Sequence, residues 1–226
     1  MNWRASTDKW LRVSVRRRLL DQHLKELRSH MHGRVLEVGA GRAGRRGEFD
    51  PPLKQAKSWL YLNLDSQVRP HVRGDVAAMP FRTGRFETLL CLEVLEYVSN
   101  PQCALREMRR MLNTKGKLIL SLPFMHRADR ENDYWRFTEP GIRYLLANNG
   151  FDVVWFKGQG AALAVVVNIL KYNIHIREGR SREWLGWFIR PVLDYMWNRD
   201  GNNAQKFPLL TTFSTGCLVM ARAKKG

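Results

Sequence analysis

The chain has 226 residues, a formal net charge of +17 at pH 7 and only three cysteines. This length is enough for one domain with a full hydrophobic core. Cys91, Cys103 and Cys217 are widely spaced and form no Cys-x-x-Cys pair, which speaks against a disulfide framework or a zinc site and favours reduced thiols in the cytoplasm.

The N-terminal segment, residues 1–33, is predicted to hold a basic amphipathic helix over about residues 8–31, because its apolar residues recur every three or four positions. It lacks the apolar core of a signal peptide, so export is not expected. Of the 17 excess positive charges, 13 lie in residues 1–34 and 157–226. Such flanks favour a partner with negative charge, namely nucleic acid, anionic lipid headgroups or a phosphate-bearing substrate, with general solubility as the alternative.

A buried strand is predicted at about residues 34–38, and it ends in a glycine-rich turn. Glu37 closes the apolar run, and Gly39 and Gly41 come directly after it. Glycines at the end of a strand let the backbone approach a nucleotide-like ligand at the carboxyl edge of a parallel sheet. Asp65 ends the next apolar run, 24 residues after Gly41, near the offset of about 20 residues at which an acid meets ribose hydroxyls.

Four further strands and two helices are expected downstream. Strands are predicted at about 71–74, 86–92, 116–122 and 151–157, with helices over 101–112 and from Thr138 to the stop at Gly150. Together with the strands at 34–38 and 59–64, and a small apolar run at 215–223 as an antiparallel last strand, this pattern predicts an α/β fold. The expected architecture is a Rossmann-like, seven-stranded, mostly parallel sheet in a single domain, residues 1–226, with a helical insertion before the last strand.

The insertion, about residues 159–210, holds two distinct parts. Residues 160–172 are predicted to form a buried helix, and the longest uncharged apolar run, 160–170, is shorter than the roughly 18 residues that cross a bilayer. Residues 182–197 combine aromatic side chains with arginines. Such a segment suits a lid, a pocket wall or a membrane-surface helix, and the alternative is a helix pair that extends the core.

The acidic strand ends and the run after residue 86 resemble the class I S-adenosylmethionine-dependent methyltransferases. The resemblance implies that Glu37, Gly39 and Gly41 hold the methionine part of the cofactor and that Asp65 binds the ribose. It also implies three more cofactor-binding residues: the acid beside the adenine, the amide that bonds a ring nitrogen, and the last residue of the fourth strand, which are Asp75, Val76 and Leu92.

A nicotinamide dehydrogenase is the rival interpretation of the same glycines. Gly39, Gly41 and Gly44 satisfy the dinucleotide fingerprint Gly-x-Gly-x-x-Gly. That fold needs a long helix directly after the turn, whereas residues 42–52 are rich in glycine and proline. The methyltransferase interpretation is therefore preferred.

The loop after the fifth strand narrows the resemblance. The sequence Asp-Tyr-Trp-Arg-Phe-Thr at 133–138 resembles a bacterial subset of these enzymes associated with glycan, lipopolysaccharide and secondary-metabolite pathways. In that fold the loop faces the cofactor's sulfonium, so Tyr97, Tyr134 and Trp135 are expected to contact the substrate. Arg136 is expected either to bind a substrate anion or to lock the loop to Asp133.

A methyl transfer to a weakly acidic oxygen needs a general base, and His126 is the candidate, with Asp133 as second choice. Relatives often carry histidine at the position of Tyr97, which leaves this assignment open. Glu96 is expected on a solvated helix face, and no metal site is expected.

The predicted function is S-adenosylmethionine-dependent methyl transfer to a small-molecule, sugar or lipid-linked acceptor, with oxygen as the expected atom. One alternative is a nucleic-acid (RNA) methyltransferase, against which stands the absence of an Asn/Asp-Pro-Pro-Tyr/Phe tetrad after the fourth strand. Another is a non-catalytic scaffold. The expected location is the cytoplasm, with peripheral association at the inner membrane face; the sequence predicts no oligomeric state.

Overall fold

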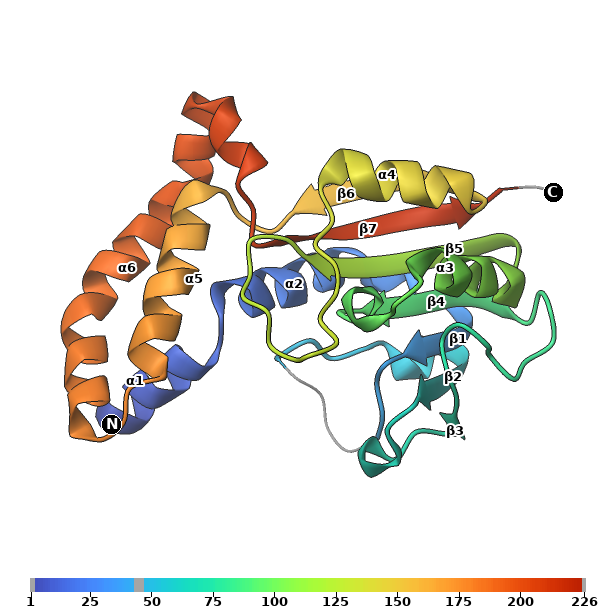
Figure 1. The fold of residues 1–226 in the computed structure, drawn as a ribbon, viewed down its shortest axis with the longest axis horizontal. Coiled ribbons are helices and arrows are strands. Elements are labelled where there is room, and N and C mark those ends of the chain that lie inside the picture. Colours follow the sequence, from blue (N-terminus) through green and yellow to red (C-terminus); the bar gives the residue numbers. More distant parts are fainter. Residues whose placement is uncertain (1–2, 43–46, 225–226) are drawn as a thin grey trace.

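The computed structural model describes residues 3–42 and 47–224 of the chain. A seven-stranded sheet in the order β3-β2-β1-β4-β5-β7-β6 forms its centre (Figure 1). The strands are β1 (Gly33–Val38), β2 (Ala56–Asn63), β3 (Val72–Arg73), β4 (Phe86–Leu92), β5 (Leu112–Pro123), β6 (Phe151–Gly158) and β7 (Gly216–Ala223). All neighbours are parallel except β7, which is antiparallel to both β5 and β6. The predicted fold class is confirmed.

Helices cover both faces of the sheet, which is why the inner strands are continuous apolar runs. One face packs against α3 (Pro101–Met111) and α4 (Glu139–Asn148), and the other packs against α2 (Val15–Glu26). Adjacent residues of β4 serve opposite faces: Leu89 belongs to the core under α3, and Leu90 belongs to the core under α2. Both side chains are fully buried.

The prediction of one continuous helix over residues 8–31 is wrong. The structure has α1 (Trp3–Arg12), then α2, then the short 3-10 helix η1 (Arg28–His30). Ser14 begins α2 as its N-cap, because its Oγ accepts a hydrogen bond of 3.1 Å from the Arg17 amide. The apolar stripe is thereby divided, and α1 and α2 pack on different parts of the molecule.

The insertion before β7 consists of α5 (Ala162–His175), α6 (Arg180–Lys206) and the 3-10 helix η5 (Pro208–Thr212). With α1, these helices form a unit beyond the carboxyl ends of the parallel strands (Figure 1). Trp10 and Leu11 from α1 share a separate core with Ala164 and Leu193. The Asp200 carboxylate accepts hydrogen bonds from the amides of Ala161 at 2.7 Å and Ala164 at 3.0 Å, so the end of α6 caps the start of α5.

Among the residues that the structure describes, no helix is long and apolar enough to cross a membrane. Gly44, the third glycine of the dinucleotide pattern, lies outside the described residues. Between residue 47 and the 3-10 helix η2 (Leu53–Gln55), the described part of the chain is irregular. No helix of a dinucleotide-binding kind therefore starts between residues 47 and 52.

Candidate active site

The sheet order brings the predicted cofactor residues to one edge. β1, β2 and β3 are adjacent and parallel, so the segments after their carboxyl ends, which carry Gly39, Asp65 and Asp75, lie side by side. The Gly39 amide donates a hydrogen bond of 2.8 Å to the Leu62 carbonyl, which ties the turn after β1 to the end of β2. The ligand site of an open α/β sheet lies at this edge, where the strand order reverses between β1 and β4.

Gly39 and Gly41 are required by close packing in this turn. Gly39 has a φ of +79°, and a Cβ there would lie 2.2 Å from Cγ2 of Val94. A Cβ on Gly41 would lie 2.0 Å from the backbone oxygen of Val68. Glycine alone allows the turn after β1 to approach the segments after β2 and β4 so closely; Gly39 is exposed at the edge of the sheet and Gly41 is buried.

The two aspartates after β2 and β3 are exposed and held by their own turns. Oδ1 of Asp65 accepts a hydrogen bond of 2.8 Å from the Gln67 amide, and Oδ1 of Asp75 accepts one of 2.8 Å from the Ala77 amide. These bonds orient carboxylates that are the acceptors a pair of ribose hydroxyls or an adenine amino group needs. The Val76 side chain is buried in the core.

Glu37 lies deeper than the two aspartates. Its side chain is 3% exposed, and Oε2 accepts a hydrogen bond of 2.9 Å from Nε1 of Trp59 on β2. Leu92, the last residue of β4, is half-buried. The glycine turn and the two exposed carboxylates fit the cofactor that the sequence resemblance implies. Glu37 is bonded to β2 inside the fold, and its predicted contact with the cofactor stays a prediction.

Arg136 locks the loop between β5 and α4. Its guanidinium forms a bidentate ion pair with Asp133, and it donates to the backbone oxygens of Arg127 at 2.9 Å and His126 at 3.3 Å. The Asp133 side chain is 2% exposed, and its hydrogen bond with Arg136 lowers the pKa of Asp133. Of the two roles considered for Arg136, the structure has the lock. A carboxylate so engaged is a poor proton acceptor.

Tyr97 also anchors this loop. Its hydroxyl donates a hydrogen bond of 2.8 Å to Oδ1 of Asp129, and burial raises the pKa of Tyr97. The Glu96 carbonyl accepts hydrogen bonds from the amides of Tyr134 at 2.9 Å and Trp135 at 3.3 Å. The loop is therefore fixed over the carboxyl end of β4.

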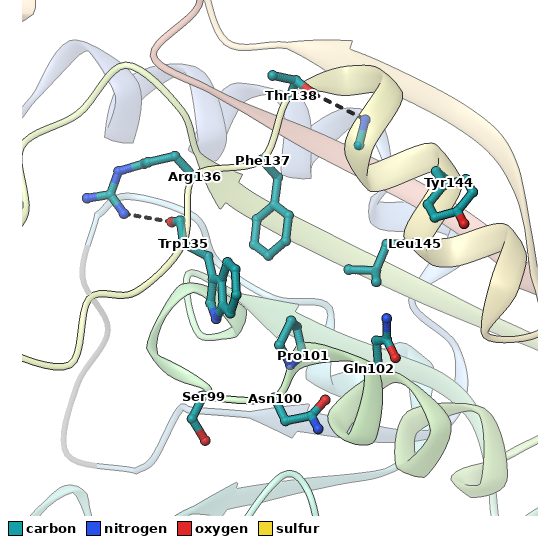
Figure 2. A pocket seen from close by; sticks show the side chains of 11 residues that line it. Ser99, Asn100, Pro101, Gln102, Trp135, Arg136, Phe137, Thr138, Tyr144 and Leu145 are labelled. Atoms are coloured by element: carbon teal, nitrogen blue, oxygen red, sulfur yellow. Dashed lines mark hydrogen bonds between the residues drawn. The ribbon is translucent and has the colours of Figure 1, made fainter.

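Two of the four predicted substrate residues line one cavity, whereas Tyr97 and Tyr134 line neither of the two cavities that the described residues form. Trp135 and Arg136 line a pocket of about 520 Å³ that the loop forms with the start of α3 and with α4 (Figure 2). Nε1 of Trp135 donates a hydrogen bond of 2.9 Å to the Val98 carbonyl. His126 instead lines a larger cavity of about 710 Å³ between the α1–α2 junction, α5 and the same loop.

His126 is neutral at physiological pH. Burial and the nearby Arg16, Arg127 and Arg136 lower the pKa of His126 to about 4. The neutral imidazole can accept a proton, although so low a pKa makes it a weak base. Its predicted catalytic role, like the other residue roles, stays a prediction.

Sequence reasoning missed a buried charged cluster at the end of β4. Glu93 adopts a φ of +59°, rare for a residue with a side chain. It forms an ion pair with Arg16 of α2, and its Oε1 accepts a hydrogen bond of 2.9 Å from Oγ of Ser121. Burial and the neighbouring Arg17 lower the pKa of Arg16 to about 10.

Glu96 belongs to this cluster, so its prediction as a solvated residue is wrong. It is 1% exposed, because the 3-10 helix η4 (Leu95–Tyr97) turns it inward beneath the loop. Burial raises the pKa of Glu96 to about 7. Two acids three residues apart after a strand were the available sequence signal. Nothing in the sequence pointed to Arg16.

Across the described part of the chain, no group of three His, Cys, Asp or Glu side chains is placed to hold a metal ion.

Comparisons with known proteins agree with this fold. Residues 50–120 match the sequence model of a methyltransferase domain family. An uncharacterized protein of Methanocaldococcus jannaschii is 35% identical over 102 residues, which cover 42% of this chain and 45% of that protein. The tRNA U34 carboxymethyltransferase of Campylobacter concisus is 30% identical over 88 residues, which cover 38% of this chain and 29% of that protein. The chain thus spans less than half the length of the curated relatives it matches.

A solved structure with this fold is a Burkholderia thailandensis enzyme, 1,6-didemethyltoxoflavin-N1-methyltransferase, with bound 1,6-didemethyltoxoflavin and S-adenosylhomocysteine. It has a TM-score of 0.52 and 17% identity, over 99% of this chain and 84% of that one. At this identity the likeness shows the fold. Residues 50–120 are thus similar to a methyltransferase domain, and the glycine turn and the exposed aspartates of this fold suit S-adenosylmethionine as a cofactor.

Proposed function

We propose that this protein transfers a methyl group from S-adenosylmethionine to an oxygen of a small-molecule, sugar or lipid-linked acceptor. The observation that carries the proposal is the cavity of about 710 Å³ at the carboxyl edge of the sheet, lined by the neutral imidazole of His126. The glycine turn and the two exposed aspartates stand at the same edge, after β1, β2 and β3. The cavity thus has room for an acceptor beside a proton acceptor, and the predicted cofactor residues, which do not line it, lie at the same edge of the sheet.

The cofactor, when bound, supplies a methyl carbon activated by a positively charged sulfur. The chain's own contribution is then mainly positioning of the acceptor. The locked loop holds His126 at the cavity wall, where its neutral ring can take the proton that the acceptor hydroxyl loses. The pKa of Glu96 lies closer to physiological pH than that of His126. Glu96, however, is 1% exposed and is absent from the cavity lining. We therefore keep His126 as the proposed base.

An RNA acceptor is the second candidate, and two observations favour it. The net charge is +17, and one curated relative acts on tRNA. The distinguishing experiment incubates the purified protein with methyl-labelled S-adenosylmethionine and a cell extract, and then measures label in the saccharide, lipid and RNA fractions. Label in saccharide or lipid is expected. Label confined to RNA would replace the proposal with this alternative, and cofactor binding without label in any fraction would favour a scaffold.

We also propose that the protein associates peripherally with anionic membranes from the cytoplasmic side. On α6, Trp184, Trp187 and Phe188 are 47%, 48% and 67% exposed, and their rings contact one another. Trp3 of α1 joins this cluster with its ring 5.1 Å from that of Trp184, and Arg4 lies over Trp3 at 5.4 Å. Aromatic rings with nearby cations suit the headgroup layer.

The basic segment predicted over residues 8–31 contributes only in part to this proposed membrane surface. The polar face of α2 does not contribute as a whole, because Arg16 is buried against β4. Co-sedimentation with anionic and neutral vesicles at low and high salt tests the proposal. Binding to anionic vesicles at low salt is expected, and it should weaken in the variant Phe188→Ser. Tyr144→Ser, which removes an aromatic residue of α4 that is 72% exposed, is the control. Protein that stays in the supernatant at low salt contradicts the proposal.

A further inference from the structure

The cavity of about 710 Å³ has a composition that the proposed function does not explain. It lies between the α1–α2 junction, α5 and the loop after β5, and its volume is within the roughly 300–1,000 Å³ typical of ligand sites. Among the described residues, its lining includes Arg12, Arg16, Arg17, Arg127 and Lys171, besides two histidines, and no Asp or Glu. Asp8 and Glu93 pair with Arg12 and Arg16 from outside the lining, and five cations against these two acids still leave the cavity with a positive potential.

Neighbouring groups hold several of these cations in place. Arg12 pairs with Asp8 at 2.6 Å, and the guanidinium of Arg127 lies 4.6 Å from the ring centroid of Tyr172. These contacts fix the direction of the guanidinium groups and leave further N–H donors for a ligand, because each guanidinium carries five. The cationic groups of the lining are therefore ordered before any ligand enters.

Lys171 is the most deeply placed of the cations. It is 2% exposed. Its Nζ donates a hydrogen bond of 2.8 Å to the Val13 carbonyl and lies 4.3 Å from the ring centroid of Trp10. Burial, with Arg18 nearby, lowers the pKa of Lys171 to about 7. An anion in the cavity would stabilise the protonated amine and would offset the free-energy cost of burying its charge.

The lining also contains apolar side chains, next to the polar Ser14 and Asn168. The apolar residues are Leu11, Val13, Met125, Val165, Ile169 and Tyr172. Ile169 is half exposed although it lies on α5 beside the buried Val165. A lining that combines cations with aliphatic side chains matches a ligand that carries both an anionic group and an alkyl chain.

We infer that this cavity binds an anionic amphiphile, a phosphate ester attached to an aliphatic chain, and that this is the acceptor class. That this ligand is the methyl acceptor rests on the proposed function. The binding site itself is inferred from the lining alone. The phosphate would lie among the arginines and Lys171, and the chain would lie along α5. His126 also lines this cavity, so a hydroxyl close to the bound phosphate would lie near the proposed base.

Calorimetry with octyl phosphate, octanol and inorganic phosphate tests the inference. Octyl phosphate should bind more tightly than either half alone. Arg127→Gln should weaken that binding roughly tenfold, about 1.4 kcal/mol, and Ile169→Asp should weaken it as well. The matched control is Arg199→Gln, because Arg199 also lies over a tyrosine, Tyr195 at 5.3 Å, but outside the cavity.

Three results would overturn the inference. Octanol that binds as tightly as octyl phosphate would show an apolar cavity, and phosphate that does so would show an anion site. Competition by vesicles that contain phosphatidic acid would identify a membrane lipid as the source, and octyl phosphate binding without such competition would identify a soluble ester. Cofactor binding is measured on the same preparation. A protein that binds S-adenosylmethionine but no octyl phosphate refutes this inference and leaves the proposed function standing.

Discussion

The buried carboxyl of Glu96 should make stability depend on pH in an unusual direction. Burial raises the pKa of Glu96 from 4.5 to about 7. Below about pH 4.5 the group is protonated in both folded and unfolded chains and has no effect. As pH rises towards 7 the unfolded chain loses the proton first, so the folded state is progressively destabilised. The full penalty is reached above pH 7.

The magnitude is set by the size of the pKa shift. At 1.36 kcal/mol per unit, the difference between 4.5 and about 7 corresponds to roughly 3 kcal/mol. Since the side chain is 1% exposed, solvent screening reduces this little. Glu96→Gln keeps the shape and removes the ionisation. The stability of the variant relative to the wild type should therefore increase by roughly 2–3 kcal/mol from pH 5 to pH 8.

Urea unfolding of both proteins at several pH values between 5 and 8 measures this gain. His126 and His23, whose pKa values are lowered to about 4, titrate in both proteins, so their contributions cancel in the difference. Glu131→Gln, an exposed acid of the neighbouring loop, is the control for the loss of one negative charge. Parallel stability curves for the wild type and Glu96→Gln would refute the assignment of a strongly raised pKa to Glu96.

Three further predictions concern the proposed site. Asp65→Ala should weaken S-adenosylmethionine binding by about 2–4 kcal/mol in calorimetry, through loss of two charge-assisted hydrogen bonds; unchanged affinity in a folded variant removes Asp65 from the site. Gly41→Ala should cost roughly 1–3 kcal/mol of stability and also weaken cofactor binding, because its Cβ would lie 2.0 Å from the Val68 oxygen; wild-type values in both measurements would show that the turn can relax. His126→Ala should lower turnover by roughly 100- to 10,000-fold with cofactor affinity retained; a near-normal rate over pH 6–9 would exclude it as the base.

The strands could be located from the sequence by their apolar centres, although β2 and β5 begin at Ala56 and Leu112, before the predicted starts at 59 and 116. β4 has the predicted limits, 86–92. The division of the N-terminal segment could not be predicted in this way, because its apolar spacing continues through Ser14. What separates α1 from α2 is that the two helices pack on different cores, which is a tertiary property.

The site was predictable in part, and the reason differs between its halves. Gly41 and Asp65 lie within one chain segment whose spacing reflects the geometry of the site. The buried cluster joins Arg16, from α2, to Glu93, from the end of β4. The two residues are 77 positions apart in the chain, so their contact leaves no local pattern. Glu96 was misjudged because burial by a distant loop cannot be seen in a helical spacing.

The cap that Asp200 places on α5 has a consequence for the order in which parts of the molecule open. The carboxylate bonds the amides of Ala161 and Ala164 from a position near the far end of α6. Fraying of the last turns of α6 therefore releases the first turn of α5, although the two stretches are far apart in the chain. Amide hydrogens of both should exchange with solvent in a single opening event. Because α5 lines the cationic cavity, the cavity wall should open together with the α5–α6 hairpin.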